Sequence, residues 1–290
     1  MTDASQIAPP APGPTPAAVA SPYPQRGAWS FFSAAVGAPR KTLDLCRARR
    51  IDFLDVMVND GSADHLKPVP FVIGHHGLGR TDILAAAQVW RDGGLRFGFT
   101  TWISPRTEWI EGMALVGELA AQAGAESVTI DAEEPWIVRL RKTPLPEVHA
   151  LADRATGHLR RTCGARIGIT HTVYADWPLV DALLDYADED VPQAYATGPS
   201  PTSRGNATHL KPGDLERVAV ARWERHGDAR LPIIMGAAGW SQEGAYGLGY
   251  LPAWRASLEA GRTAGASGVR VWQLGAIDVA EAAVLREVWS

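Results

Sequence analysis

The sequence predicts an α/β protein built as a single (β/α)8 TIM barrel. Short apolar runs alternate with longer segments of helical periodicity from Gly27 onward, a pattern typical of βα units around a parallel sheet. Eight such units fit into about 260 residues, which is the size expected of a (β/α)8 barrel. An open, doubly wound sheet of eight strands is the weaker alternative. With 46 % hydrophobic residues, the chain can bury a sizeable core.

The predicted strands are short runs rich in β-branched and aromatic residues. In chain order they are Ala28–Phe32, Phe53–Val58, Leu95–Trp102, Ser127–Ala132, Ala165–Thr170, Asp190–Tyr195, Leu231–Ala237 and Gly268–Leu274. The predicted helices are the amphipathic segments that follow them. They are Arg40–Arg49, Thr81–Arg91, Thr107–Ala123, Pro146–Thr162, Pro178–Tyr186, Asp214–Arg225, Leu251–Ala264 and Val279–Val288. The segment after strand two does not fit the repeat, because it contains Pro68, Pro70 and Phe71–Gly79. It predicts an insertion with room for a hairpin over the barrel mouth.

Residues 1–26 differ from the rest of the chain. They are dominated by Pro and Ala, a composition that stays extended and buries no core. We therefore assign 1–26 to a tail or linker, which could attach the chain to a larger assembly, and 27–290 to the barrel. The tail lacks the basic start and apolar stretch of a secretory signal, and no apolar run is long enough to span a bilayer. We expect no membrane insertion, and export only by another route or a removed leader.

Charge and cysteine content narrow the function classes further. The chain has 28 basic and 32 acidic residues, a formal net charge of −4, and no long basic block. This balance argues against a nucleic-acid or anionic-membrane partner. Cys46 falls in a predicted helix and Cys163 directly follows another, far away in the sequence, which favours reduced structural cysteines over a disulfide or a metal site.

Two carboxylates stand where the fourth predicted strand ends. Side chains alternate along a strand, so Asp131 and Glu133 project from one face while Ala132 points away. Barrel enzymes carry their chemistry at the carboxyl ends of the strands. The negative charges of two neighbouring carboxylates repel each other, so ionising both costs free energy. One of them therefore acquires the raised pKa that a general acid needs. The alternative interpretation is a solvated acidic loop.

Aromatic and amide side chains dominate the ends of the other strands. The chain has 11 Trp but only six Phe. Tryptophan platforms with amide and phenol hydrogen-bonding groups suit a carbohydrate cleft, so we expect an oligo- or polysaccharide substrate. The candidate substrate-binding residues are Trp102, Glu134, Trp136, Tyr174, Gln193, Trp240, Trp272 and Gln273.

Three of these strand ends resemble family 18 glycoside hydrolases, the chitinase-like barrels. The segment Asp131-Ala-Glu133-Glu-Pro135 is similar to the end of that family's strand-four signature. Pro192-Gln-Ala-Tyr195 resembles its polar strand six, and Gly268-Val-Arg-Val-Trp272 resembles the strand whose tryptophan floors the sugar subsite. The matches fall on strands four, six and eight, as in the family.

The resemblance implies a mechanism as well as a fold. Glu133 would protonate the glycosidic oxygen and then activate water, with Glu134 as the alternative acid. Asp131 would orient and stabilise an N-acetyl group acting as internal nucleophile, with Tyr195 bonding its oxygen and Trp272 stacking under the sugar. Such hydrolysis is retaining, needs neither metal nor cofactor, and implies an N-acetylated glycan such as chitin or peptidoglycan.

The chain departs from the family pattern at two strands. Thr129 stands where the family usually has a further Asp, and Phe97–Trp102 lacks its Ser-x-Gly-Gly pattern. Family 25 lysozymes are a close alternative, because they share an Asp-x-Glu and a late Trp-Gln like Trp272-Gln273. One observation argues against them: the end of strand one is Trp29-Ser-Phe and has no Asp.

Two further classes remain as alternatives. A catalytically silent carbohydrate-binding or scaffold barrel would also fit the departures. A metal-dependent hydrolase could combine His75, His76 and His171 with the two carboxylates, although adjacent histidines point opposite ways on a strand. Separately, Arg270 shares the parity of Trp272, so we expect it inside the barrel and paired with Asp55.

Overall fold

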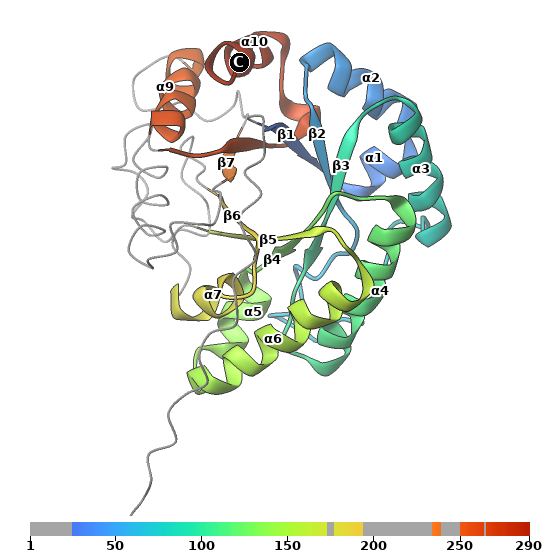
Figure 1. Ribbon diagram of the computed structural model, residues 1–290, viewed down its shortest axis with the longest axis vertical. Helices are drawn as coiled ribbons and strands as arrows, with labels where there is room; N and C mark the ends of the chain where they lie inside the picture. Colours follow the sequence, from blue (N-terminus) through green and yellow to red (C-terminus); the bar gives the residue numbers. More distant parts are fainter. Residues whose placement is uncertain (1–24, 173–176, 194–233, 239–249, 264) are drawn as a thin grey trace, which may run out of the picture.

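The computed structural model describes residues 25–172, 177–193, 234–238, 250–263 and 265–290. Eight parallel strands, paired in sequence order, form a closed barrel, as the sequence predicted. The strands are β1 (Gln25–Ser30), β2 (Phe53–Met57), β3 (Arg96–Trp102), β4 (Ser127–Asp131), β5 (Arg166–Thr172), β6 (Glu189–Gln193), β7 (Ile234–Ala238) and β8 (Gly268–Trp272). β1 pairs with β8 in the register Gly27↔Arg270, which closes the ring. Figure 1 shows this ring of strands with helices around it.

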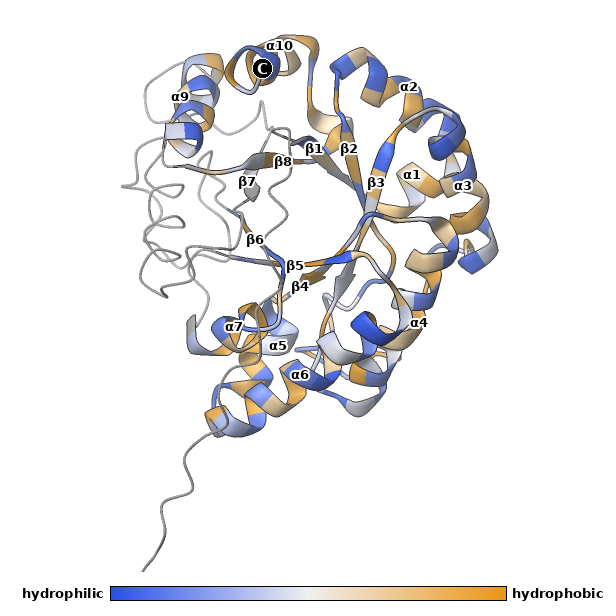
Figure 2. Ribbon diagram, in the orientation of Figure 1, coloured by the Kyte–Doolittle hydropathy of each residue, from blue (hydrophilic) through white to orange (hydrophobic). Residues whose placement is uncertain are grey.

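The described helices lie outside the ring. They are α1 (Phe32–Gly37), α2 (Pro39–Arg49), α3 (Arg80–Asp92), α4 (Thr107–Ala123), α5 (Glu134–Leu140), α6 (Leu145–Thr162), α7 (Trp177–Leu184), α9 (Tyr250–Thr263), the 3-10 helix η2 (Leu274–Ala276) and α10 (Val279–Val288). Hydrophobic and hydrophilic residues stand side by side along them (Figure 2), as expected of helices with one buried face. No described helix is long and apolar enough to cross a membrane.

Local sequence explains where these elements begin and end. α10 starts at a capping box in which Asp278 accepts a hydrogen bond from the backbone of Glu281 and Glu281 accepts one from the backbone of Asp278. α4 stops at Gly124, whose φ of 70° lies in the left-handed region that glycine adopts without strain. The two short helices α1 and α5 were not predicted.

The barrel begins earlier in the chain than predicted. β1 begins at Gln25, so the barrel starts inside the segment that the sequence assigned to the tail. The rest of that tail and the predicted helix Asp214–Arg225 lie outside the described residues.

Cys46 and Cys163 are buried free thiols, as predicted, and burial raises the pKa of Cys46 to about 12.

The barrel strands β2 and β8 hold the predicted ion pair. Arg270 Nε donates to Asp55 Oδ2 over 2.8 Å, and both residues are buried. The guanidinium also lies 4.1 Å from the centre of the Phe53 ring. The residue paired with Arg270 on β1 is Gly27, and it must be glycine because a Cβ there would lie 2.3 Å from Arg270 Cδ.

The predicted insertion after strand two is a long β2–α3 loop that returns to the barrel mouth. Gly74 N–H donates to Val58 O over 2.8 Å, which fixes the returning segment beside the end of β2. His75 and Leu78 then form an antiparallel bridge across His76 and Gly77, whose φ values of 52° and 79° are those of a tight hairpin turn. The expected hairpin is therefore present in minimal form.

Candidate active site

The two carboxylates lie together at the carboxyl end of β4. Asp131 is the last residue of the strand and is 4 % exposed, and Glu133 stands directly before α5. Ala132 between them is fully buried in the core outside the sheet. Asp131 and Glu133 therefore share a face of the strand end, as the alternation of the sequence predicted.

Gln193 at the end of β6 connects the two carboxylates. Its Nε2 donates to Glu133 Oε1 over 2.7 Å and lies 3.3 Å from Asp131 Oδ1. One amide group thus reaches both carboxylates, which places them in mutual contact range. The predicted contact of Gln193 with substrate stays a prediction; in this structure its amide holds the acidic pair.

The surroundings of the pair favour protonated carboxyl groups. Burial, reinforced by the charges of Glu133 and Glu134, raises the pKa of Asp131 well above its ordinary value. Burial also raises the pKa of Glu133 to about 7, with Gln193 opposing and Glu134 adding to the rise. Because the two groups interact strongly, they titrate as a pair and can hold one shared proton near neutral pH. This is the state required of a general acid with a charged neighbour.

A cavity of about 660 Å³ opens in front of the carboxylates. Its lining combines aromatic rings with polar groups: Phe31, Phe32, Ser33, Met57, Asn59, Asp60, Ser62, His75, His76, Trp102, Asp131, Glu133, Gln193 and Trp272. Trp272 packs edge-on against Phe31 with ring centres 4.9 Å apart, and a cis peptide bond joins it to Gln273. A volume of this size and a mixed apolar and polar lining suit a small part of an oligosaccharide.

The structure brings only some of the predicted residues to this cavity. Trp102 and Trp272 line it, whereas Gln273 and Glu134 are not among the lining residues. Glu134 instead raises the pKa of Glu133. The assignment of Trp136 to the substrate site is corrected: the side chain is fully buried and its indole N–H donates to Leu179 O over 2.8 Å. The remaining predicted residues, Tyr174, Tyr195 and Trp240, lie outside the described residues.

The described residues of the metal hypothesis do not form a metal-binding group. Among the described residues, no group of three or more His, Cys, Asp or Glu side chains could hold a metal ion. His171 is fully buried, with its Nε2 2.9 Å from Asp190 Oδ1, and shares the strand parity of the core residue Ile169. It therefore faces away from the barrel interior, while His75 and His76 line the cavity.

No pattern in the sequence marked the part of the cavity wall that the β2–α3 loop builds. Asn59, Asp60, Ser62, His75 and His76 line the cavity from this loop. They lie outside any regular strand or helix, so no periodic pattern marks them, and only the double histidine stood out.

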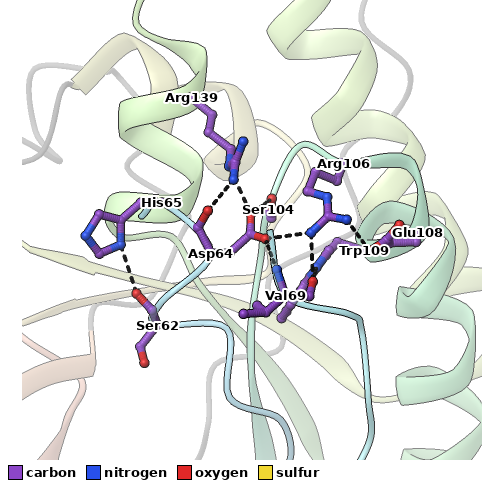
Figure 3. Close-up of polar contacts among 9 residues, drawn as sticks. All are labelled: Ser62, Asp64, His65, Val69, Ser104, Arg106, Glu108, Trp109 and Arg139. Atoms are coloured by element: carbon purple, nitrogen blue, oxygen red, sulfur yellow. Dashed lines mark hydrogen bonds and ion pairs between the residues drawn. The ribbon is translucent and has the colours of Figure 1, made fainter. Parts of the chain in front are cut away.

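A buried carboxylate anchors this loop, as Figure 3 shows. Asp64 is fully buried and accepts hydrogen bonds from Ser104 Oγ at 2.7 Å, Val69 N at 2.9 Å and Arg106 Nη1 at 2.8 Å. Arg139, on α5, lies 2.9 Å from it and also donates to the Asp64 carbonyl. Burial raises the pKa of Asp64, but these hydrogen bonds and charges outweigh it and hold the pKa below its ordinary value. The β2–α3 loop is thereby tied to the helix that follows Glu133.

Comparison with known proteins supports the fold. Neither a protein-family model nor a curated protein sequence matches the chain. Solved structures match it: the C-terminal domain of a putative chitinase from Desulfitobacterium hafniense DCB-2 has 11 % identity and a TM-score of 0.64, covering 92 % of this chain and 100 % of that one. The GH113 beta-mannanase AaManA from Alicyclobacillus acidocaldarius has 14 % identity and a TM-score of 0.60, covering 92 % and 98 %. The spore cortex-lytic enzyme SleL from Bacillus megaterium QM B1551 has 12 % identity and a TM-score of 0.59, covering 93 % and 75 %.

These likenesses show a (β/α)8 barrel over nearly the whole chain. The matching proteins carry several glycosidase names, so the fold does not single out family 18. The resemblance to that family therefore remains a proposal.

Proposed function

We propose that the protein is a glycoside hydrolase that cleaves an N-acetylated glycan, chitin-like or the peptidoglycan backbone. The observation that carries the proposal is the Asp131–Glu133 pair, held by Gln193 in a cavity with aromatic walls at the carboxyl ends of the strands. The glycosidase names among the matching barrels agree with this assignment.

In the proposed mechanism, Glu133 is the general acid. With a pKa of about 7, Glu133 is protonated in a large fraction of molecules at neutral pH and can give its proton to the glycosidic oxygen as the bond to the leaving sugar breaks. The acetamido oxygen of the substrate attacks the anomeric carbon, and Asp131 stabilises the charge that develops on the acetamido nitrogen. Glu133, now ionised, then takes a proton from the water that opens the cyclic intermediate, which restores the enzyme and retains the configuration.

The arrangement of the carboxylates favours the substrate's own nucleophile. A retaining enzyme with a carboxylate nucleophile places its two carboxyl groups on either side of the scissile bond. Here Asp131 and Glu133 share one amide donor, and Asp60, which lines the cavity from the β2–α3 loop, is engaged by Ser62 and His75. Trp272 would stack under the sugar, and Tyr195 keeps the acetamido-binding role that the family resemblance implies.

The test is release of reducing ends from N-acetylglucosamine oligomers and from peptidoglycan. We expect release by the wild-type protein and strong inhibition by a thiazoline that mimics the cyclic intermediate. Tyr195→Phe should lower turnover on acetylated sugars more than it weakens their binding.

Two outcomes would redirect the assignment. Binding of oligosaccharide without release of reducing ends would show a silent carbohydrate-binding barrel. Cleavage of peptidoglycan that the thiazoline does not inhibit would exclude the substrate-assisted mechanism and favour a lysozyme-like one.

A further inference from the structure

The cavity contains a deeply buried side chain to which the proposed chemistry gives no role. Asn59 lines the cavity from the start of the β2–α3 loop and is only 2 % exposed. Within the described part of the chain, its side-chain Nδ2 has no hydrogen-bond partner. Buried polar atoms are normally paired, because leaving one unpaired costs free energy. An unpaired donor on a cavity wall therefore points to a ligand that supplies the missing acceptor.

A hydrogen bond from the backbone fixes which end of the Asn59 amide is free. The side-chain Oδ1 accepts the backbone N–H of Trp102 at 2.8 Å. Turning the amide over would place its NH2 group against that N–H, so that two donors would face each other. The oxygen therefore stays on Trp102 and the NH2 group is the free end. Asn59 thus offers a ligand a hydrogen-bond donor.

The strand pairing places this donor near the carboxylates. Val58 N–H donates to Thr100 O at 2.8 Å, which continues the β2–β3 pairing beyond the last residue of β2 and brings Asn59 beside Trp102. Trp102 in turn pairs with Asp131 in the β3–β4 register, and all three residues line the cavity. Neighbouring strands lie about 4.8 Å apart, so the main chains of Asn59 and Asp131 are about 10 Å apart. A sugar ring held at Asp131 can therefore reach the Asn59 donor with one of its substituents.

The chemistry of the substrate narrows the choice of acceptor on this sugar. In the proposed mechanism the acetamido oxygen attacks the anomeric carbon, so it is not free for Asn59. The ring oxygen gains positive charge in the transition state and is a poor acceptor there. In a β-1,4-linked chain the oxygens at C1 and C4 carry the glycosidic bonds. The hydroxyl groups at C3 and C6 remain, and each has lone pairs that a donor can use.

We infer that Asn59 is a specificity-determining residue whose Nδ2 donates a hydrogen bond to a free hydroxyl group, at C3 or C6, of the sugar held at Asp131 and Glu133. This inference rests on the proposed function and adds a requirement: besides its acetamido group, the sugar must carry a free hydroxyl group where Asn59 contacts it. The Trp102 hydrogen bond holds the donor in place before the substrate arrives, so binding costs little side-chain entropy at this residue.

The test uses the thiazoline of the N-acetylglucosamine disaccharide, a mimic of the cyclic intermediate. Its thiazoline ring assigns that sugar to Asp131, so the ligand does not shift along the cavity. Two analogues each lack one hydroxyl group on the thiazoline-bearing sugar, at C3 or at C6. Isothermal titration calorimetry measures the dissociation constant of all three ligands for the wild-type protein and for each variant.

Two variants remove the donor in different ways. Asn59→Asp keeps an oxygen for the Trp102 N–H, and Asn59→Leu keeps a similar shape without any group that could donate. Gln122→Glu, the same amide-to-carboxylate change at an exposed position near the end of α4, is the matched control. Circular dichroism confirms that each variant is folded. Comparing the ligands within one protein cancels the general effect of an added charge, because that effect acts on all three ligands alike.

In the wild-type protein and in Gln122→Glu, loss of the hydroxyl group that Asn59 contacts should weaken binding about ten-fold, the change expected for one lost hydrogen bond to a buried group. In both Asn59 variants the same loss should cost no more than about two-fold, because the donor is already absent. The analogue that lacks the other hydroxyl group should give the same ratio in all of these proteins. The analogue whose ratio changes identifies C3 or C6 as the contact.

Equal ratios in all proteins for both analogues would overturn the inference, as would no binding of the thiazoline by the wild-type protein. If the wild-type protein releases reducing ends and binds the thiazoline without this dependence on Asn59, the inference alone is refuted. If the dependence is found but no reducing ends are released from N-acetylglucosamine oligomers or peptidoglycan, the proposed function alone is refuted.

Discussion

Replacing Glu133 by glutamine should make the protein more stable at alkaline pH, although it removes the proposed acid. The substitution keeps the shape of the side chain and an oxygen that can accept the Gln193 hydrogen bond. It removes the negative charge that the buried site disfavours. The site that supports the chemistry therefore destabilises the fold above neutral pH.

The magnitude follows from the pKa of Glu133, which rises from an ordinary value of 4.5 to about 7 in the folded protein. A carboxyl group with a raised folded pKa contributes stability that is fully present below the unfolded pKa and is lost as pH rises through the folded one. Each pKa unit between the two states is worth about 1.4 kcal/mol, so wild-type protein should lose about 3 kcal/mol between pH 4.5 and pH 8 through this group. The substitution also removes the charge of Glu133 from beside Asp131, which acts in the same direction.

Urea unfolding followed by tryptophan fluorescence at pH 5 and pH 8 measures the effect. We expect the stabilities of wild type and Glu133→Gln to lie within about 1 kcal/mol of each other at pH 5, and the variant to be more stable by about 3 kcal/mol at pH 8. Glu111→Gln, at an exposed position of α4, should follow wild type at both values. If wild type and Glu133→Gln change equally between the two pH values, the site does not hold Glu133 protonated, and its assignment as the acid loses its physical basis.

Three further predictions concern activity and anchoring. Glu133→Gln should abolish release of reducing ends while Glu134→Gln leaves substantial activity, and the reverse ranking would move the acid to Glu134. Turnover should fall as pH rises above about 7, because Glu133 then loses the proton it must donate; a rate that stays constant up to pH 9 would contradict this. Asp64→Asn should lower the free energy of unfolding by about 2 kcal/mol, because a neutral amide cannot form ion pairs with Arg106 and Arg139. The loss stays moderate because the two arginine side chains are 26 % and 29 % exposed, so water solvates them in part. Asp44→Asn on the exposed face of α2 is its control, and an equal effect of both changes in urea unfolding would show that Asp64 anchors nothing.

The fold was readable from the sequence because each βα unit carries its own periodic pattern. α4 and α10 have the predicted bounds, since each joins a long amphipathic run to clear end signals such as Gly124 and the Asp278 capping box. α1 and α5, of six and seven residues, span too few turns to show a helical period. Their positions depend on packing against the barrel.

The site was predictable only where it follows strand alternation. Asp131 and Glu133 lie on one face because the strand geometry extends to its end. Trp136 was placed wrongly because the chain has already turned into α5, where successive side chains follow a helical period and the indole points to Leu179. Asn59, Asp60 and Ser62 gave no local signal, because they line the cavity from a loop without a regular period.

The Arg270–Asp55 pair has a consequence for how the chain assembles during synthesis. The partners are 215 residues apart, one on β2 and the other on the last strand of the ring. Asp55 therefore leaves the ribosome long before its counter-charge, and a nascent half-barrel would have to bury that carboxylate alone, which is strongly unfavourable. The early strands should stay hydrated and open to chaperones until later strands emerge, and β8 then supplies both the last strand of the ring and the guanidinium that hydrogen-bonds Asp55.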